Sequence, residues 1–294
     1  RIELIDCQLA SRHLGSLGEA ASSHLQGPAS NANPKRQNGP HAHSINPDKT
    51  NKFAFACDLG SDKVFIYKLD PMTAKLTPND PPFASVPPAS GPRHFAFHPG
   101  GKFAWANNEM TLTVTGFAFD AAKGALEPHG AAPLAPGSGP RHLAFHPSGT
   151  SLYVINELLS TVTAFSYDAD KGALTSLQTV SALPAGFAGT SSTAEVAVSA
   201  DGRFVYGSNR GDDSLAVFAV DKATGRLTPA EHVSVGGKNP RHFTIDPTGR
   251  WILAGHQGSG TIAVLRLDAA TGMPALVGSP VKVDKPVCLL PVPQ

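Results

Sequence analysis

The chain has 294 residues, of which 41% are hydrophobic, and a formal net charge of +1. This charge, and the lack of any run of about five basic residues, argue against nucleic acid or an anionic membrane surface as a partner. No apolar stretch reaches the roughly 18 residues of a membrane-spanning helix. The 29 Gly and 26 Pro favour many short strands joined by tight turns over long helices.

The three cysteines are Cys7, Cys57 and Cys288, and no CxxC motif occurs. An odd number of cysteines without such a motif is typical neither of a disulfide framework nor of a zinc site. We therefore expect three small thiols that are buried or half-buried.

The N-terminal part of the chain gives few strand signals. Residues 1–27 resemble the end of an earlier repeat unit, and a weak helical pattern is confined to residues 17–26. The segment "GPASNANPKRQNGP" at 27–40 is polar and rich in Pro, Asn and Gly, which predicts a long loop. Because the chain begins with Arg1 and not with Met, we expect it to be a fragment or a processed product.

A repeated motif organises the rest of the chain. The stretch "SGPRHFAFHP" at 90–99 returns as "SGPRHLAFHP" at 138–147. Units of this kind, about 50 residues apart, begin near residues 40, 91, 139, 192 and 239. Short-strand repeats of this length are typical of propeller blades, each a four-stranded sheet. The predicted fold is therefore an all-β propeller with five clear blades.

The unit at 139–180 shows the expected strands most clearly. In "RHLAFHP" the large apolar residues Leu143 and Phe145 stand at alternate positions, as in a half-buried strand. The stretches "SLYVINE", "STVTAFSYD" and "LTSLQTVSAL" predict three further strands, with a Lys-Gly turn before the last. In most units the third strand ends in Asp, and the turn that follows carries Gly.

Polar residues recur at two positions of the units. The start of the first strand carries His41 and His43, Arg93 and His94, Arg141 and His142, and Arg241 and His242. The end of the second strand carries Asp58, Asn108 and Glu109, Asn156 and Glu157, Asn209 and Arg210, and His256 and Gln257. Because the first strand of each blade lines the central channel of a propeller, we expect both sets to face one axial region.

Other interpretations of these residues stay open. Arg and Glu side chains of neighbouring blades could simply pair with each other, and Pro could shape the start of each strand. His41 and His43, with Asp58, Glu109 and Glu157, could hold a divalent metal ion. The stretches "GSNRG" and "GHQGSG" fit neither a GxSxG nucleophile turn nor a dinucleotide-binding loop before a helix.

From about residue 27 to the end, the chain resembles the seven-bladed propeller lactonase family. The resemblance rests on "GPHAHSINPD", "CDLGSDKVFIYKLD", "GPRHLAFHP", "YVINELLSTVTAF", "LPAGF", "TAEVAVSADGRFVYGSNRGDDSLAVF", "NPRHFTIDPTGRWIL" and "PVCLL". The family includes bacterial 6-phosphogluconolactonases, and fungal carboxymuconate cyclases share its fold. The resemblance implies a single propeller domain over 1–294 that lacks N-terminal blades and works without metal or cofactor. We also expect the protein to be cytoplasmic.

The resemblance also implies a set of site residues. Cyclase-like members of the family place one His, two Arg and one Glu at the propeller axis, which by motif are His43, Arg141, Arg210 and Glu157. The first copy of the motif supplies Arg93 and Glu109 as rivals for the second copy. His142 and Arg241 are expected, like Arg93 and Glu109, to bind substrate.

The implied reaction is hydrolysis of a sugar lactone, most specifically 6-phospho-D-glucono-1,5-lactone to 6-phosphogluconate. Lactone opening needs an activated water and positive charge near the developing oxyanion. We expect Glu157 or His43 to act as general base, and Arg141 and Arg210 to bind the lactone oxygen or the phosphate. The alternatives are a carboxymuconate-type cyclase, which would clamp a diacid with the same Arg residues, and a non-catalytic binding module.

Overall fold

The computed structural model describes the backbone of residues 6–7 and the whole of residues 29–291. These residues form strands and turns and contain no helix, which confirms the all-β prediction. Over the same residues there is consequently no helix that could cross a bilayer. The predictions for residues 1–5 and 8–27, including the weak helical pattern at 17–26, and the prediction for the side chain of Cys7 lie outside the described residues.

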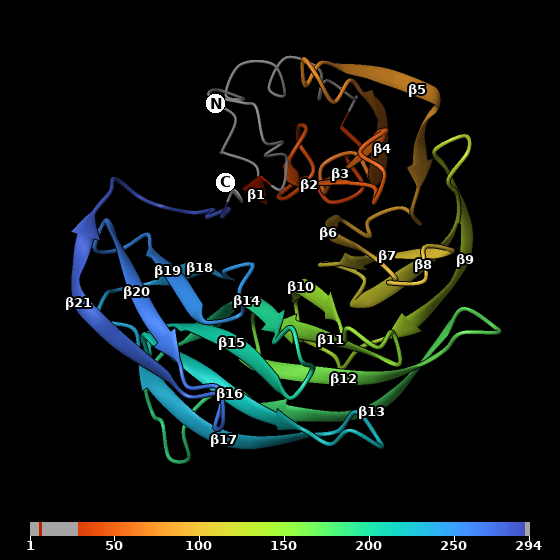
Figure 1. Ribbon diagram of the computed structural model, residues 1–294. Helices are drawn as coiled ribbons and strands as arrows, with labels where there is room; N and C mark the ends of the chain where they lie inside the picture. Colours follow the sequence, from red (N-terminus) through yellow and green to blue (C-terminus); the bar gives the residue numbers. More distant parts are fainter. Residues whose placement is uncertain (1–5, 8–28, 292–294) are drawn as a thin grey trace. The chain divides into compact units, whose positions relative to one another are not determined.

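The strands form five sheets, one for each predicted repeat unit, and in each sheet the strands lie in chain order (Figure 1). The pairings between consecutive strands are antiparallel except that of β1 with β2, which is parallel. The sheets gather into two compact units. The first unit, residues 1–135, 170–173 and 292–294, contains the first and second sheets, and the second unit, residues 136–169 and 174–291, holds the other three. The expectation of a single domain over 1–294 stays a prediction.

The described residues of the first unit form the strands β1 to β9. The first sheet consists of β2 (Ala42–Pro47), β3 (Phe53–Asp58), β4 (Lys63–Leu69) and β5 (Leu76–Ser85), and the short β1 (Asp6–Cys7) pairs in parallel with β2. The second sheet consists of β6 (Pro92–Phe97), β7 (Phe103–Asn108), β8 (Thr113–Asp120) and β9 (Ala125–Pro133). The core between the two sheets is aromatic, with the rings of Phe55 and Phe95 stacked 5.5 Å apart.

The second unit contains three sheets. The third sheet has β10 (Pro140–Phe145), β11 (Ser151–Asn156), β12 (Thr161–Asp168) and β13 (Ala173–Ser181). The fourth has β14 (Ser192–Val198), β15 (Phe204–Arg210), β16 (Ser214–Val220) and β17 (Leu227–Ser234). The fifth has β18 (Pro240–Ile245), β19 (Trp251–His256), β20 (Thr261–Leu267) and β21 (Pro274–Lys282).

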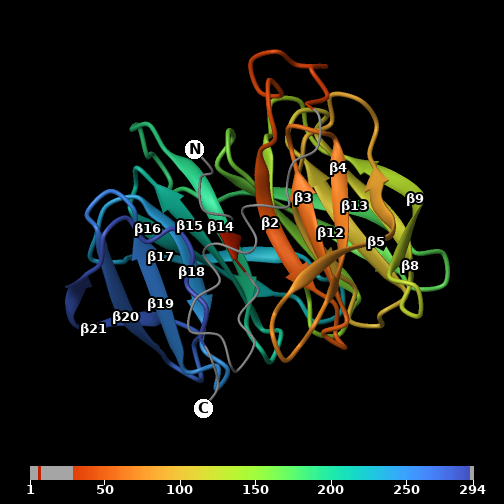
Figure 2. The ribbon, with the colours of Figure 1, turned by 90° about the horizontal axis from the view of Figure 1, so that it is seen from above.

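Neighbouring sheets of the second unit bury apolar side chains against each other. Tyr153 and Phe218 belong to a core cluster shared by the third and fourth sheets, and Tyr206 and Phe243 to one shared by the fourth and fifth. Figure 2 shows β14, β15, β18 and β19 side by side in this unit. Every residue of β11 is buried, because this strand has a sheet neighbour on each edge and packed side chains on its faces.

The turn between the third and fourth strands explains the recurrent Asp and Gly. Asp221 accepts hydrogen bonds from the hydroxyl of Thr224 and from the backbone N–H groups of Thr224 and Ala223, and these bonds hold the pKa of Asp221 below its usual value. Asp268 makes the same set of bonds in the fifth sheet. Such carboxylate-capped turns close without tertiary contacts, so their pattern is visible in the sequence.

The turn glycines also dock one sheet on the next. Gly272 has φ +70°, and a Cβ atom there would lie 2.5 Å from the ring of Phe204 in the fourth sheet. The hydroxyl of Tyr206, also in the fourth sheet, donates a 2.8 Å hydrogen bond to the carbonyl of Gly272. The backbone conformation and the neighbouring ring therefore both require glycine at this position.

The end of each second strand is tied to its hairpin turn. Asn108 and Asn156 each donate from Nδ2 to two Thr hydroxyls of the third strand. Asp58 takes this place in the first sheet, where its Oδ1 accepts from the N–H groups of His41, Gly60 and Ser61. Burial raises the pKa of Asp58, against the effect of these hydrogen bonds.

The repeated Pro-Arg-His motif coincides with a register shift in the first strand. In the third sheet Pro140 pairs with Asn156 and His142 with Ile155, so Arg141 is an extra residue without a place in the ladder. The same shift falls at His43, Arg93 and Arg241 in the first, second and fifth sheets, and between Thr193 and Val196 in the fourth. A bulge of this kind re-aims the side chains beside it.

Replacing Gly272 with Ala is expected to lower the free energy of unfolding by about 2–4 kcal/mol, because backbone strain and overlap with Phe204 add together. Gly278 is the matched control, since it has φ +66° in the same sheet but no atom within 4 Å of an added Cβ. Gly278→Ala should therefore cost only about 1 kcal/mol. Urea unfolding of both variants measures the difference, and equal losses would contradict the docking role of Gly272.

Replacing Asp58 with Asn is expected to raise the free energy of unfolding at pH 7. The raised pKa means that the folded state favours the protonated carboxyl, so this group contributes less stability as the pH rises through its folded pKa. Asp58→Asn should therefore also flatten the difference in stability between pH 5 and pH 7.

Asp70 is a control because its pKa is shifted in the opposite direction from that of Asp58. Hydrogen bonds from the backbone N–H of Met72 and from Thr73 lower the pKa of Asp70. Asp70→Asn should consequently lose stability at pH 7, with the loss shrinking as the pH falls toward the folded pKa. Urea unfolding at both pH values tests the pair, and a loss at pH 7 in Asp58→Asn would refute the assignment.

Candidate functional site

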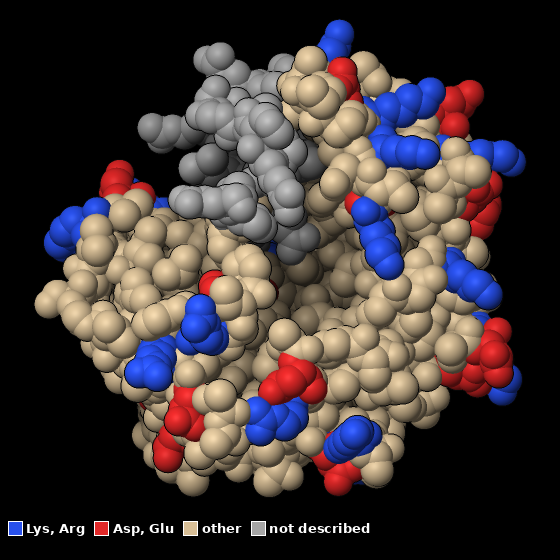
Figure 3. Space-filling view, in the orientation of Figure 1, with Lys and Arg blue, Asp and Glu red and all other residues tan. Residues whose placement is uncertain are grey.

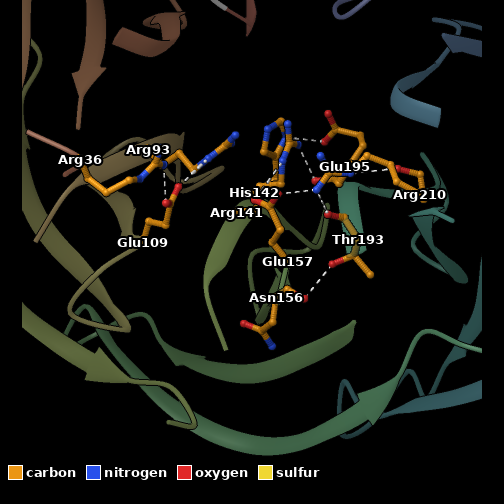
Figure 4. A network of polar contacts seen from close by, with 12 residues as sticks. Arg36, Arg93, Glu109, Arg141, His142, Asn156, Glu157, Thr193, Glu195 and Arg210 are labelled. Atoms are coloured by element: carbon orange, nitrogen blue, oxygen red, sulfur yellow. Dashed lines mark hydrogen bonds and ion pairs between the residues drawn. The ribbon is translucent and has the colours of Figure 1, made fainter. Parts of the chain in front are cut away.

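In the second unit, Glu157 lies between two arginines from different sheets (Figure 4). Arg141 Nε is 3.6 Å from Glu157 Oε2, and Arg210 Nη2 is 2.5 Å from Glu157 Oε1. Arg210 Nη2 also donates to the carbonyl of Thr193 at 2.8 Å, and Arg141 Nη1 to the carbonyl of Ala194 at 2.8 Å. Sequence reasoning named all three charged residues, and the structure brings them together.

The repeat places these residues in register. Arg141 is the bulged residue of β10, while Glu157 and Arg210 each follow directly after the Asn that ends the regular part of a second strand. Because the Asn is tied to its hairpin, the next residue is held at a defined position at the end of the sheet. The third and fourth sheets thus present a Glu and an Arg at equivalent places, where they pair.

This trio can act on an anion. Two guanidinium groups share one carboxylate, so the three side chains together carry a net charge of +1. Arg141 is fully buried and Glu157 is 24% exposed, so part of the cluster is removed from water while its carboxylate remains accessible. Arg forks in such surroundings bind carboxylate, phosphate or a developing oxyanion through charge-assisted hydrogen bonds.

A second cluster in the same unit joins three sheets through Glu195. His142 Nδ1 lies 2.9 Å from Glu195 Oε1, and His242 Nε2 lies 3.2 Å from Glu195 Oε2. The backbone N–H of Val196 donates to Glu195 Oε1 at 3.0 Å, and that of Leu289 donates to His242 Nδ1 at 3.2 Å. All three side chains are mostly buried.

Sequence reasoning missed Glu195 as a site residue. It predicted His142 as substrate-binding and placed His242 in the motif, but it assigned no role to the Glu of "TAEVAV". The available signal was positional. Glu195 follows the start of a first strand in the fourth sheet, where the motif otherwise has His, and an acidic residue there interrupts an apolar strand.

The first unit holds a close copy of the Arg–Glu pair. Arg93 Nε is 3.2 Å from Glu109 Oε2, and Arg36 Nη2 is 2.5 Å from Glu109 Oε1. Arg93 and Glu109 occupy the same repeat positions as Arg141 and Glu157. The second cation differs in origin, because Arg36 comes from the predicted loop at 27–40 and not from the end of a strand, and sequence reasoning gave it no role.

The other predicted residues have defined places in the repeat. His43 is the bulged residue of β2 in the first unit, and Arg241 is the bulged residue of β18 in the second, beside His242. Both are half-buried. That the residues of the two units face a single axial region remains a prediction.

The proposed metal ligands have structural partners in several cases. Asp58 is engaged by three backbone N–H groups, and Glu109 and Glu157 by arginines. Within residues 29–291, no group of three or more His, Cys, Asp or Glu is arranged to hold a metal ion. Cys57 is buried, as predicted, and burial raises the pKa of its thiol to about 12, while Cys288 is half-buried.

The surface carries mixed charge. On the face of each unit that Figure 3 shows, Lys and Arg side chains are interspersed with Asp and Glu side chains. This distribution matches the near-neutral composition of the chain.

The chain is similar in sequence to proteins named 6-phosphogluconolactonase. It is 32% identical to that of Bacillus subtilis (strain 168) over 255 residues, which cover 87% of this chain and 58% of the relative. It is 39% identical to that of Pectobacterium carotovorum subsp. carotovorum (strain PC1) over 206 residues, which cover 70% of this chain and 47% of the relative. The chain thus spans about half the length of the curated relatives it matches.

Solved structures show the same kinship. A protein from Lactobacillus plantarum superposes with a TM-score of 0.76 at 27% identity, covering 83% of this chain and 72% of that one. The periplasmic gluconolactonase of Pseudomonas aeruginosa superposes with a TM-score of 0.52 at 33% identity, covering 89% of this chain and 59% of that one.

The family model described as "Lactonase, 7-bladed beta-propeller" matches residues 8–133 and 117–291. The two matches together take in all five sheets and every charged residue of the two clusters. Repeat, fold and sequence similarity agree, and the chain belongs to the family of seven-bladed β-propeller lactonases.

Proposed function

We propose that this chain carries the site of an enzyme that hydrolyses a sugar lactone, specifically 6-phospho-D-glucono-1,5-lactone to 6-phosphogluconate. Support comes from relatives named 6-phosphogluconolactonase and, above all, from Glu157 held between Arg141 and Arg210. A site built around two guanidinium groups matches a substrate that carries a phosphate dianion and develops negative charge on its carbonyl oxygen.

The arginines would supply electrostatic stabilisation. Attack of water on the lactone carbonyl places negative charge on oxygen, and prearranged donors in a partly dry site stabilise this charge more than water does. Arg141 is fixed by Glu157 and by the carbonyl of Ala194, and Arg210 by Glu157 and the carbonyl of Thr193. Both therefore need little reorganisation when substrate binds.

The arrangement changes the role we assign to Glu157. Each of its oxygens pairs with a guanidinium group, so Glu157 is better placed to hold two arginines in position than to accept a proton from water. His43, the other expected base, lies in the first unit. We keep it, with Arg93, Glu109, His142 and Arg241, as a residue proposed to line the substrate site.

The reaction is proposed to need neither metal nor cofactor and to take place in the cytoplasm. Purified protein should accelerate hydrolysis of the phosphorylated lactone equally with and without EDTA, relative to a heat-inactivated sample that corrects for spontaneous opening. A loss of activity with EDTA that added metal restores would overturn metal independence.

Substrate comparison separates the candidate functions. A phosphate-binding site predicts faster turnover of the phosphorylated lactone than of unphosphorylated glucono-1,5-lactone, whereas the similarity to a gluconolactonase favours the reverse. The arginine pair would also clamp a diacid, so turnover of a carboxymuconate would indicate a cyclase. If no lactone or muconate reacts, the lactonase proposal fails and the binding-module alternative is favoured.

Arg210→Ala and Glu157→Gln should each lower kcat/KM for lactone hydrolysis at least about tenfold, because the first removes a charge-assisted donor and the second loosens both arginines. Arg203→Ala is the matched control, since Arg203 pairs with Asp201 on an exposed turn of the same sheet. Circular dichroism and urea unfolding check that each variant is folded. Wild-type activity in both site variants would remove the assignment.

A further inference from the structure

We propose that the first unit contains an anion-binding site of its own, in which the guanidinium group of Arg36 binds a phosphate group. Arg93 and Glu109 form the inner part of this site. The proposal goes beyond the lactonase function, because it concerns the first unit by itself and does not depend on whether the chain opens a lactone.

The three charged side chains run from the interior of the first unit to its solvent-exposed surface. Arg93 is 4% exposed, Glu109 17% and Arg36 47%. Each carboxylate oxygen of Glu109 pairs with one of the two arginines, as Figure 4 shows. The cluster therefore carries a net charge of +1, and its most accessible member is a cation.

A buried polar network holds the loop that carries Arg36. The next side chain, that of Gln37, is fully buried, and its Nε2 donates to Asp62 Oδ1 at 2.8 Å. The hydroxyl of Ser30 donates to Asp62 Oδ2 at 2.7 Å, and the backbone N–H of Asn33 donates to Gln37 Oε1 at 3.0 Å. The backbone on both sides of Arg36 is thus fixed.

The same carboxylate also fixes the other side of the site. Asp62 is buried and accepts 2.8 Å hydrogen bonds from the backbone N–H groups of Ala89 and Gly91, which precede β6. The carbonyl of Gly91 in turn accepts from the N–H of Glu109 at 3.0 Å. One buried side chain therefore holds the loop of Arg36 and the backbone of Glu109 together, so the site is in place before an anion binds.

The equivalent cation of the second unit is less accessible. Arg210 is 12% exposed, and its Nη2 donates both to Glu157 and to the carbonyl of Thr193. Arg36 comes from a loop and is 47% exposed. The first unit thus offers to solvent an arginine whose counterpart in the second unit is largely covered.

The chemistry of the guanidinium group determines the class of ligand. It presents several N–H donors in a planar fork, remains charged at physiological pH, and matches two oxygens of one anion. Arg36 uses Nη2 toward Glu109, and an anion can approach the exposed part of the same side chain. A phosphate group carries more negative charge and more acceptor oxygens than a carboxylate, so it gains more from this arrangement.

The test is isothermal titration with inorganic phosphate at constant ionic strength, on the wild-type chain and on Arg210→Ala, which lacks one cation of the second unit's trio. In both backgrounds Arg36→Ala should raise the Kd of phosphate at least about tenfold, the loss expected for a charged hydrogen-bond donor. Lys35→Ala is the matched control, because Lys35 is an exposed cation one residue away in the same loop, and it should leave the Kd nearly unchanged. Circular dichroism and urea unfolding verify that each variant folds.

A further variant and two further ligands test the chemistry of the site. Arg36→Lys keeps the charge but lacks the planar fork, so it should weaken phosphate binding, though less than Arg36→Ala does. Glucose 6-phosphate should depend on Arg36 as inorganic phosphate does, and gluconate, which has a carboxylate instead, should bind more weakly. Wild-type affinity in Arg36→Lys, or gluconate binding as tight as that of phosphate, would refute recognition of phosphate by the guanidinium fork.

The remaining outcomes decide whether the site exists. Equal losses in Arg36→Ala and Lys35→Ala would mean that the loop attracts anions by its overall charge, and the site would be overturned. It would also be overturned by an unchanged Kd in Arg36→Ala, or if the wild-type chain binds no phosphate. Lactone hydrolysis plays no part in these titrations, so failure of this site and failure of the proposed function are separate results.

Discussion

One extra residue near the start of each first strand is the constraint on which the candidate site depends. The shift falls at the same place in all five sheets, and the residues in or beside it include Arg141, His142 and Glu195. A regular strand would send adjacent side chains to opposite faces of its sheet. The bulge releases the chain from this alternation, so one sheet can contribute a cation and an imidazole to the same network.

Partners from the neighbouring sheet make the buried charges tolerable. Isolated ionised groups are costly to bury, and the cost is offset only where the remaining donors and acceptors are used. Arg141 pairs with Glu157 of its own sheet and donates to a carbonyl of the next sheet. Arg210, which belongs to that next sheet, also pairs with Glu157. In the first unit the loop residue Arg36 pairs with Glu109, as Arg210 pairs with Glu157 in the second unit. The two copies of the motif therefore differ in which segment supplies the second arginine.

The second unit divides its polar residues into two groups with different chemistry. The arginine-rich trio favours anions, while Glu195 contacts the imidazole rings of two histidines from the neighbouring sheets. The two groups meet at adjacent residues of β10, Arg141 and His142. The same strand register thus places both groups of polar residues at one point of the fold.

The sequence by itself determined the five sheets, their strand order within each unit, the Asp-capped turns and the pairing candidates Arg141, Glu157 and Arg210. These features follow from local alternation, turn chemistry and a repeat, all of which lie within one unit of about 50 residues. Only the tertiary structure decided that Glu195 joins His142 to His242, that Arg36 reaches Glu109, and that Asp58 belongs to a turn. These contacts join residues of different sheets or depend on backbone N–H groups, and the order of residues along one strand carries no information on what lies opposite.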